Sequence, residues 1–228
     1  MNIVITGASR GIGFDTALLL SQQPKHQIVA ISRNTEALQE LNKAASYQNI
    51  QTIATDITEN PSTVVEAIKT KLPSVDVLIH NAGLLINKPF AELTPENWQK
   101  IFEVNLFAPV QLTRGLLSHI NKGAHIVNIG SMGGFQGSGK FAGLSAYSAS
   151  KAAIANFSEC LAEELKDQGI SVNCLALGAV QTAMLAEAFP GYQAPMSSQK
   201  MAAFLAHFAT EGHQFYNGKV LPVSLATP

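Results

Sequence analysis

Charged residues are scarce in this sequence. They make up 14% of the chain, against about 25% in an average globular protein. The formal net charge is −1, and there is no basic run of the kind that nucleic acid or an anionic membrane would need. A low charge content leaves little polar cover for the surface, which favours burial of part of that surface in an oligomer.

Long apolar runs and signal features are also lacking. No apolar stretch approaches the ~20 residues of a membrane span. The N-terminal "MNIVITGASRG" is typical of a strand entering a turn and lacks the basic region and apolar core of a signal peptide. The two cysteines, Cys160 and Cys174, have no metal-ligand spacing and predict buried thiols in a reducing compartment. We therefore expect a cytoplasmic protein without metal, nucleic-acid or membrane partners.

What the sequence does contain is a regular alternation of strand and helix patterns. Its short β-branched runs are almost wholly apolar, as in strands that are buried on both faces. This order predicts one Rossmann-type, doubly wound α/β domain over residues 1–228, with a seven-stranded, mostly parallel sheet flanked by helices on both faces. The expected strands are 2–6, 27–32, 50–55, 75–80, 124–130 and 170–176, with a last strand in "FYNGKVLPVSL".

Two of the expected helices are long. The first spans "TPENWQKIFEVNLFAPVQLTRGLLSHI", with Thr94 as its N-cap, and the second spans "SAYSASKAAIANFSECLAEELKDQG" and ends at Gly169. The segment 183–200 then breaks the alternation and contains Pro190 and Pro195. Because long loops in compact domains usually carry function, we expect an irregular substrate loop there.

The stretch "TGASRGIG" follows the first strand and opens the first helix. Its glycines allow backbone to approach a pyrophosphate closely, and the helix N-terminus adds free N–H groups and a partial positive charge. This strand–turn–helix context predicts dinucleotide binding, and the lack of a following Gly-Lys-Ser/Thr argues against a P-loop. The predicted contacts in this turn are Gly7, Ser9, Arg10, Gly11, Ile12 and Gly13.

The end of the second strand indicates which dinucleotide is bound. An acidic residue there would bond an adenosine ribose and repel a 2′-phosphate, but this sequence has Ser32 and Arg33. Arg10 can reach the same region, and an arginine fork suits phosphate oxygens. The sequence therefore favours NADP(H) over NAD(H). If Arg33 is only a solvated surface charge, the site would accept either cofactor.

Tyr147 and Lys151 lie one helical turn apart in "YSASK". On one helix face, the ammonium group would favour the phenolate form of the tyrosine. Such a phenol can exchange the proton when a hydride donor reduces a carbonyl. An ordinary helical turn ending in a solvated lysine has the same five letters, so the pentapeptide alone leaves both interpretations open.

Several motifs in sequence make the chain resemble the short-chain dehydrogenase/reductase family over nearly its whole length. They are the glycine turn, "ATDIT", "HNAG", "EVNLFAP", "IVNIGS" and "YSASK". The resemblance implies adenine contacts from "ATDIT", after the third strand, and ribose contacts from "HNAG". It also implies backbone contacts to the cofactor carboxamide after the sixth strand. The residues carried over are Asp56, Ile57, Asn81, Ala82, Gly83, Gly178, Val180 and Thr182.

The resemblance further implies a catalytic set of Asn105, Ser131, Tyr147 and Lys151. The serine would bond the substrate oxygen as charge develops there, and the asparagine would help to hold a water that links the lysine to solvent. An asparagine that only bonds its local backbone is the alternative for Asn105.

The choice of serine depends on position. Ser131 directly follows a predicted strand, although its interval to the tyrosine is longer than is common in the family. Ser138 lies in the glycine-rich loop with no strand to fix it, and Ser145 is too near the tyrosine to oppose it across a substrate. We therefore predict Ser131 and an insertion in the loop. One departure from the family pattern is Leu177, which stands where proline is usual.

Together these features predict an NADP(H)-dependent oxidoreductase that interconverts a small-molecule carbonyl and its alcohol. The alternative is a catalytically silent NADP(H)-binding regulatory or scaffold protein, which would be expected to lose the tyrosine or the lysine.

In the family, the helices holding Asn105 and Tyr147 pack against their copies, so a homodimer or homotetramer is expected. The second helix carries the small residues Ala152, Ala153, Ala155 and Ala162. Candidate pocket walls are Phe135, Phe141, Leu144, Met184, Phe189 and Tyr192.

Overall fold

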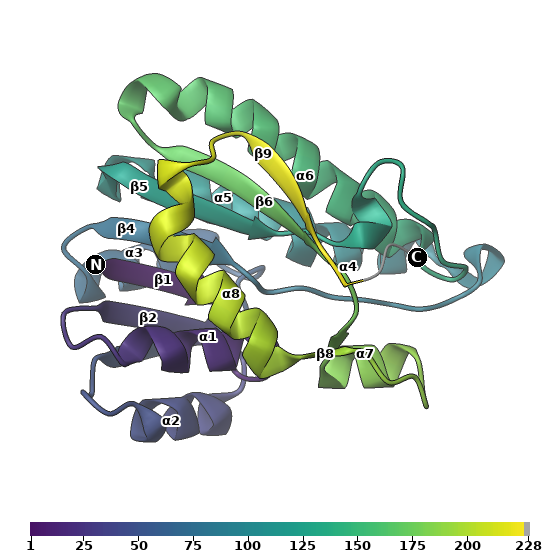
Figure 1. The fold of residues 1–228 in the computed structure, drawn as a ribbon, viewed down its shortest axis with the longest axis horizontal. Helices are drawn as coiled ribbons and strands as arrows, with labels where there is room; N and C mark the ends of the chain where they lie inside the picture. Colours follow the sequence, from purple (N-terminus) through teal and green to yellow (C-terminus); the bar gives the residue numbers. More distant parts are fainter. Residues whose placement is uncertain (226–228) are drawn as a thin grey trace.

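A parallel sheet forms the centre of the computed structural model, which describes residues 1–225 (Figure 1). Its strand order is β3-β2-β1-β4-β5-β6-β9, and neighbouring strands run parallel. The predicted seven-stranded, doubly wound sheet is therefore confirmed. The strand order reverses between β1 and β4, where folds of this kind bind ligands. The bounds are β1 Asn2–Thr6, β2 Gln27–Ser32, β3 Ile50–Ala54, β4 Val75–His80, β5 Ile120–Ile129, β6 Ser171–Leu177 and β9 Lys219–Val223.

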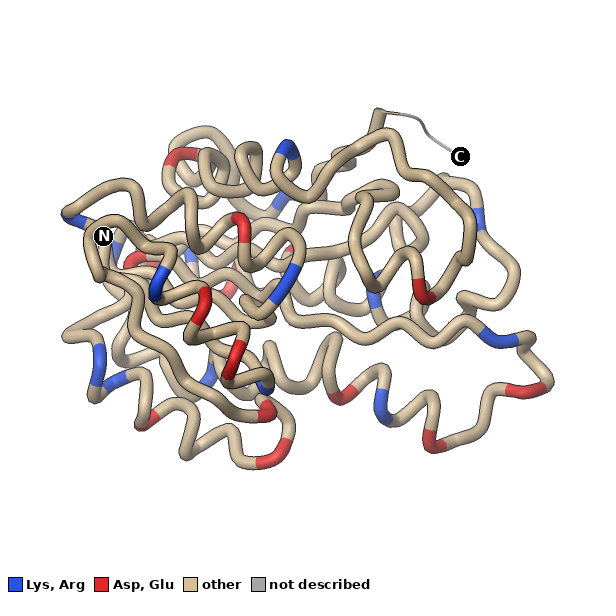
Figure 2. The backbone as a smooth tube through the Cα atoms, turned by 90° about the horizontal axis from the view of Figure 1, so that it is seen from below, with Lys and Arg blue, Asp and Glu red and all other residues tan. Residues whose placement is uncertain are grey.

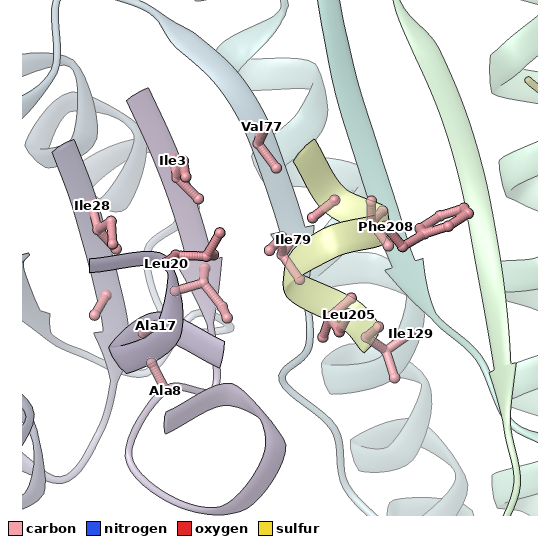
Figure 3. Close-up of a cluster of buried hydrophobic side chains, with 14 of the residues drawn as sticks. Ile3, Ala8, Ala17, Leu20, Ile28, Val77, Ile79, Ile129, Leu205 and Phe208 are labelled. Atoms are coloured by element: carbon pink, nitrogen blue, oxygen red, sulfur yellow. The ribbon is translucent and has the colours of Figure 1, made fainter. Parts of the chain in front are cut away.

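Helices cover both faces of this sheet and bury two apolar cores. On one face, α1 (Gly11–Ser21), α2 (Thr35–Ala44) and α8 (Ser198–Glu211) pack on β1, β2, β4, β5 and β6. Figure 3 shows Leu20 of α1 and Leu205 of α8, which belong to the same core, over the strands of the sheet. On the other face, the second core is made with α3 (Pro61–Lys71), α5 (Ala108–Leu116) and α6 (Ser145–Leu165).

The predicted long helix over residues 94–120 is interrupted. Thr94 caps α4 (Pro95–Phe102) as expected, since its hydroxyl accepts the backbone N–H of Asn97 at 3.3 Å. A π-helical turn, η2 (Glu103–Phe107), then separates α4 from α5. Such turns often occur at functional sites. After α5, a 3₁₀ turn ends at His119, and β5 begins at Ile120, earlier than predicted.

The segment 183–200 is more regular than its sequence suggests. It contains the short helix α7 (Ala183–Ala188) and the strand β8 (Met196–Ser197), which pairs with β7 (Val180–Gln181). Helix α8, which the sequence analysis did not identify, follows at once. The sequence pattern that could have predicted this helix is the spacing of Met201, Leu205 and Phe208, which are all buried in the structure.

The surface and the cysteines complete the fold. Positions of Lys or Arg and of Asp or Glu are interspersed along the backbone (Figure 2). Within residues 1–225, no helix is long and apolar enough to cross a membrane, and no cluster of potential metal ligands occurs.

The two cysteines differ in exposure. Cys174 is buried as predicted, but Cys160, on α6, is exposed. The prediction of two buried thiols was therefore wrong for Cys160.

Candidate functional site

A cavity of about 1000 Å³ opens at the carboxyl ends of the strands, where the strand order reverses. Its walls come from segments that are far apart in the sequence, from the glycine turn to the end of β9. The structure thus brings together eighteen of the twenty predicted site residues around one space. They are Gly7, Ser9, Arg10, Gly11, Ile12, Ser32, Arg33, Asp56, Ile57, Asn81, Ala82, Gly83, Ser131, Tyr147, Lys151, Gly178, Val180 and Thr182.

The glycine turn is tied directly to the end of β4. The hydroxyl of Thr6 accepts the backbone N–H groups of Asn81 and Ala82, each at 3.1 Å. In return, the amide of Asn81 donates to the carbonyls of Thr6 at 3.1 Å and Gly7 at 3.0 Å. Gly7 has φ +71°, and a Cβ there would lie 2.7 Å from the Cα of Ala82. The turn therefore requires glycine, and its bare backbone forms a cradle that suits a pyrophosphate.

Gly13 does not line this cavity among the described residues, and its contact with the cofactor stays a prediction. A Cβ at Gly13 would lie 2.3 Å from the carbonyl oxygen of Gly7 and 2.4 Å from the Asn81 amide nitrogen. The glycine lets α1 approach the turn closely. Its role is to support the cavity floor from beneath.

Two arginines lie at the far end of the cavity, and each faces a carboxylate. Arg33 pairs with Asp56 at 3.6 Å, and its side chain is 75% exposed. Burial alone would raise the pKa of Asp56, but hydrogen bonds from Thr58 and the nearby Arg33 hold this pKa below its ordinary value. Arg10 pairs with Glu187 of α7 at 2.9 Å. This second pair was not predicted from the sequence.

Tyr147 and Ser131 also line the cavity, and their side chains lie beside each other. Burial raises the pKa of the Tyr147 phenol, and a hydrogen bond from the Ser131 side chain opposes that rise. Ser131 follows β5 and its hydroxyl also accepts the backbone N–H of Gly133 at 3.2 Å. Ser138 is instead occupied within its loop, where it donates to the carbonyl of Phe135 at 2.9 Å. Ser145 is not on the described cavity wall.

Lys151 is buried behind this pair, with only 4% of its surface exposed. Its Nζ donates to the carbonyl of Ile129 at 2.6 Å and lies 5.9 Å from the centre of the Tyr147 ring. Burial lowers the pKa of Lys151 to about 8, although the nearby Cys174 acts in the opposite sense. The sequence argument expected the lysine to lower the tyrosine pKa. In the protein itself, burial raises this pKa, and the effect that opposes the rise comes from the Ser131 hydrogen bond.

Asn105 is not on the described cavity wall but lies one layer behind it. A Cβ at Gly83 would lie 3.6 Å from both the Asn105 Oδ1 and the Lys151 Nζ. The Asn105 amide donates to the hydroxyl of Ser150 at 2.9 Å, and that hydroxyl donates to the carbonyl of Tyr147 at 2.7 Å. The bond from Asn105 joins residues 45 positions apart, so the alternative of an asparagine that bonds only its local backbone is wrong.

The remaining walls are mainly apolar. Of the six candidate wall residues, Phe141, Leu144, Met184, Phe189 and Tyr192 line the cavity, whereas Phe135 does not among the described residues. Leu177, at the position where proline was expected, also lines it.

The cavity also has a row of polar side chains on α4 and η2, which the sequence analysis missed. Their i, i+3, i+4, i+7 spacing in the sequence could have predicted that they share one helix face. The members of this row are Glu96, Gln99, Lys100 and Glu103.

Comparisons with known proteins agree with this geometry. Residues 1–193 match the family described as short chain dehydrogenase. The chain belongs to the short-chain dehydrogenase/reductase family. It is 30% identical over 235 aligned positions to the 3-oxoacyl-[acyl-carrier-protein] reductase FabG of Escherichia coli (strain K12), covering 97% of this chain and 94% of that protein. It is also 33% identical over 193 residues to the short-chain dehydrogenase/reductase FrzI of Cladobotryum sp, covering 80% and 72% of the two chains.

Solved structures of this family superpose closely on the chain. The L-sorbose reductase of Gluconobacter frateurii, complexed with NADPH and L-sorbose, matches with a TM-score of 0.87 and 25% identity, over 99% of this chain and 95% of that one. A short chain dehydrogenase from Burkholderia cenocepacia J2315, in complex with NADP, matches with a TM-score of 0.86 and 25% identity, over 97% and 95%. The protein is thus an oxidoreductase of this family by sequence and by fold.

Proposed function

We propose that this protein interconverts a carbonyl and an alcohol with NADP(H), with Tyr147 as the proton donor and acceptor. The observation that carries the proposal is the grouping of Tyr147, Ser131 and Lys151 around the same cavity as a glycine turn and two arginines. A catalytically silent binding protein would not need the buried phenol of Tyr147 and the buried ammonium group of Lys151 together beside the end of β5.

The residues present fit a nicotinamide dinucleotide. Gly7 and Gly83 both line the cavity, and backbone without a side chain allows close approach of a pyrophosphate. Ser9, Ile12, Asp56 and Ile57 line the cavity beside this cradle. Relatives of known structure were solved with NADPH and with NADP. When bound, the dinucleotide supplies or accepts the hydride.

The chain's own residues handle the proton and the developing charge. Ser131 would donate to the substrate oxygen and hold it beside the phenol. Tyr147 would give its proton to that oxygen during reduction and take it back during oxidation. Lys151 would stabilise the phenolate form, because its ammonium group lies within one helical turn of the ring. Asn105 would act as a positioning residue through Ser150.

A preference for NADP(H) follows from the charges at the adenosine end. No carboxylate occupies the position of Ser32, the last residue of β2, which lines the cavity. The one nearby carboxylate on the wall, that of Asp56, is already engaged by Thr58 and Arg33. Arg10 and Arg33 can each bind a phosphate, either beside the carboxylate partner or in place of it.

The test is oxidation of NADPH across a panel of diketones, aldehydes, quinones, pteridines and acyl thioesters, with Tyr147→Phe as the control. Wild type should turn over at least one carbonyl, and Tyr147→Phe should lose nearly all turnover while binding NADPH with unchanged affinity. A Tyr147→Phe variant as active as wild type would refute the mechanism. An inert wild type that still binds NADPH would instead support a silent binding protein.

We also propose that the protein forms a homodimer or homotetramer through α6 and the helices around Asn105. Ala152 of α6 is exposed and Phe107 is 43% exposed, so small and apolar side chains are open there. Ala155 and Ala162 are buried within the chain and cannot contribute to a contact, contrary to the sequence expectation. Light scattering at micromolar concentration should give a dimer or larger, and a monomer would contradict the proposal.

A further inference from the structure

The C-terminal end of α7 is bonded to two segments that are far apart in the sequence. Glu187 pairs with Arg10 of the glycine turn, with 2.9 Å between the carboxylate Oε1 and the guanidinium Nη1. The carbonyl of the next residue, Ala188, accepts a hydrogen bond from the Asn87 side chain at 2.8 Å. Consecutive residues of α7 therefore bridge the cofactor turn and the segment that follows β4.

Arg10 lies at the same end of the cavity as Arg33. The turn that carries it is bonded to the last part of β2, because the backbone N–H groups of Gly7 and Ala8 both donate to the carbonyl of Ile31. Ser32 and Arg33 follow directly. Both arginines line the cavity. A phosphate on the adenosine ribose would therefore meet both cations.

The two cations are not equally engaged. The Arg33 pair is longer, at 3.6 Å, whereas the Arg10 pair has a hydrogen-bond distance of 2.9 Å. The side chains of Arg10 and Glu187 are 59% and 66% exposed, so their pair is weak enough for a phosphate dianion to displace it. The displaced carboxylate would stay close to the new anion, and like charges at that range repel.

We propose that Glu187 is a selectivity-determining residue that competes with the 2′-phosphate of NADP(H) for Arg10. It weakens binding of the phosphorylated cofactor and leaves binding of NAD(H), which has a hydroxyl at that position, unchanged. This inference rests on the proposed function, which takes Arg10 as a phosphate ligand. The ion pair moderates the cofactor preference that the sequence alone predicts.

The test is a fluorescence titration of the full chain with NADPH and with NADH, which needs no carbonyl substrate. Glu187→Gln should bind NADPH about three- to tenfold more tightly than wild type, with NADH affinity changed less than about twofold. The gain should shrink at high salt, since both side chains are exposed. Glu163→Gln is the matched control, because Glu163 is an exposed carboxylate on α6 that pairs with Lys166 away from the cavity. It should change neither affinity.

Arg10→Gln separates this inference from the proposed function. If Arg10→Gln weakens NADPH binding but Glu187→Gln has no selective effect, the arginine binds the phosphate and the proposed competition is wrong. If Arg10→Gln leaves NADPH binding unchanged, the phosphate assignment in the proposed function fails. An equal gain for NADPH and NADH in Glu187→Gln would overturn the competition, since it would reflect easier opening of α7.

Discussion

Asn105 and Leu84 exchange two hydrogen bonds across the cavity wall. The backbone N–H of Leu84 donates to the Asn105 Oδ1 at 2.8 Å, and the Asn105 Nδ2 donates to the carbonyl of Leu84 at 2.9 Å. The side chain thus pairs with the segment after β4 as a neighbouring strand would. It is buried, with 2% of its surface exposed, and it sits in the π-helical turn η2. Regular α-helical geometry ends with α4, and the π-helical turn that follows carries the Asn105 amide.

Replacing Asn105 by alanine should therefore affect both stability and turnover. The backbone groups of Leu84 and the hydroxyl of Ser150 would lose their partner inside the protein, which costs about 2–4 kcal/mol of unfolding free energy. Because Ser150 bonds the carbonyl of Tyr147, kcat should also fall while the affinity for NADPH is kept. Urea denaturation and cofactor titration measure the two effects. Asn156→Ala, at an exposed position on α6, is the control and should change neither.

Ser131 and Ser138 should respond differently to the same substitution. Ser131→Ala removes the hydroxyl beside Tyr147 and should lower kcat about 10²-fold, as does loss of a donor to a developing oxyanion. The lost hydrogen bond opposes the raised pKa of Tyr147, so this pKa should rise further. In the direction of alcohol oxidation, the pH–rate profile should shift toward higher pH. Ser138→Ala should keep kcat within a few-fold, and equal losses in both variants would contradict the assignment of Ser131.

Two buried histidines should make the protein sensitive to mild acid. Burial lowers the pKa of His80 to about 3 and that of His125 to about 4, so both are neutral in the folded chain at pH 5. In the unfolded chain, each binds a proton below its ordinary pKa of about 6.5. Stability is therefore fully present above pH 6.5 and is lost as the pH falls from there toward the folded-state values. The expected loss between pH 7 and pH 5 is about 2 kcal/mol for each histidine.

Urea denaturation at pH 7 and pH 5 measures this loss. Replacing His125 by Gln should reduce the difference between the two pH values, even if the variant is less stable at both, because His125 also bonds Asn173 and Ala209. His207→Gln, at an exposed position on α8, should leave the difference unchanged. Equal unfolding free energies of wild type at both pH values would contradict the prediction.

The sequence predicted the parallel sheet and the cavity well because both depend on local patterns. Buried parallel strands consist of short apolar runs, and the glycine turn and "HNAG" lie directly after such runs. Since parallel strands end at the same edge, residues that follow them come together even when they are far apart in the chain. Ser131 was distinguished from Ser138 by this rule, and the loop bonds of Ser138 agree with it.

What could not be predicted depends on tertiary contacts. No pattern in "EVNLFAP" marks the π-helical turn, which forms where the Asn105 side chain meets Leu84. The pKa of Tyr147 depends on how deeply the phenol is buried, and spacing to a lysine carries no information about burial. The pair of Arg10 and Glu187 joins the first helix to α7, so neither residue signals the other in the sequence.

The first helix and the last one described support each other. Ala17 and Leu20 of α1 share a core with Leu205 and Phe208 of α8, and the two helices lie side by side over the sheet (Figure 3). The glycine turn stands at the start of α1, so its support arrives only after α8 has been made. Contacts between such distant segments slow folding, because a long loop must close first. The cofactor turn, although it is made well before α8, should therefore be among the last parts to become fixed.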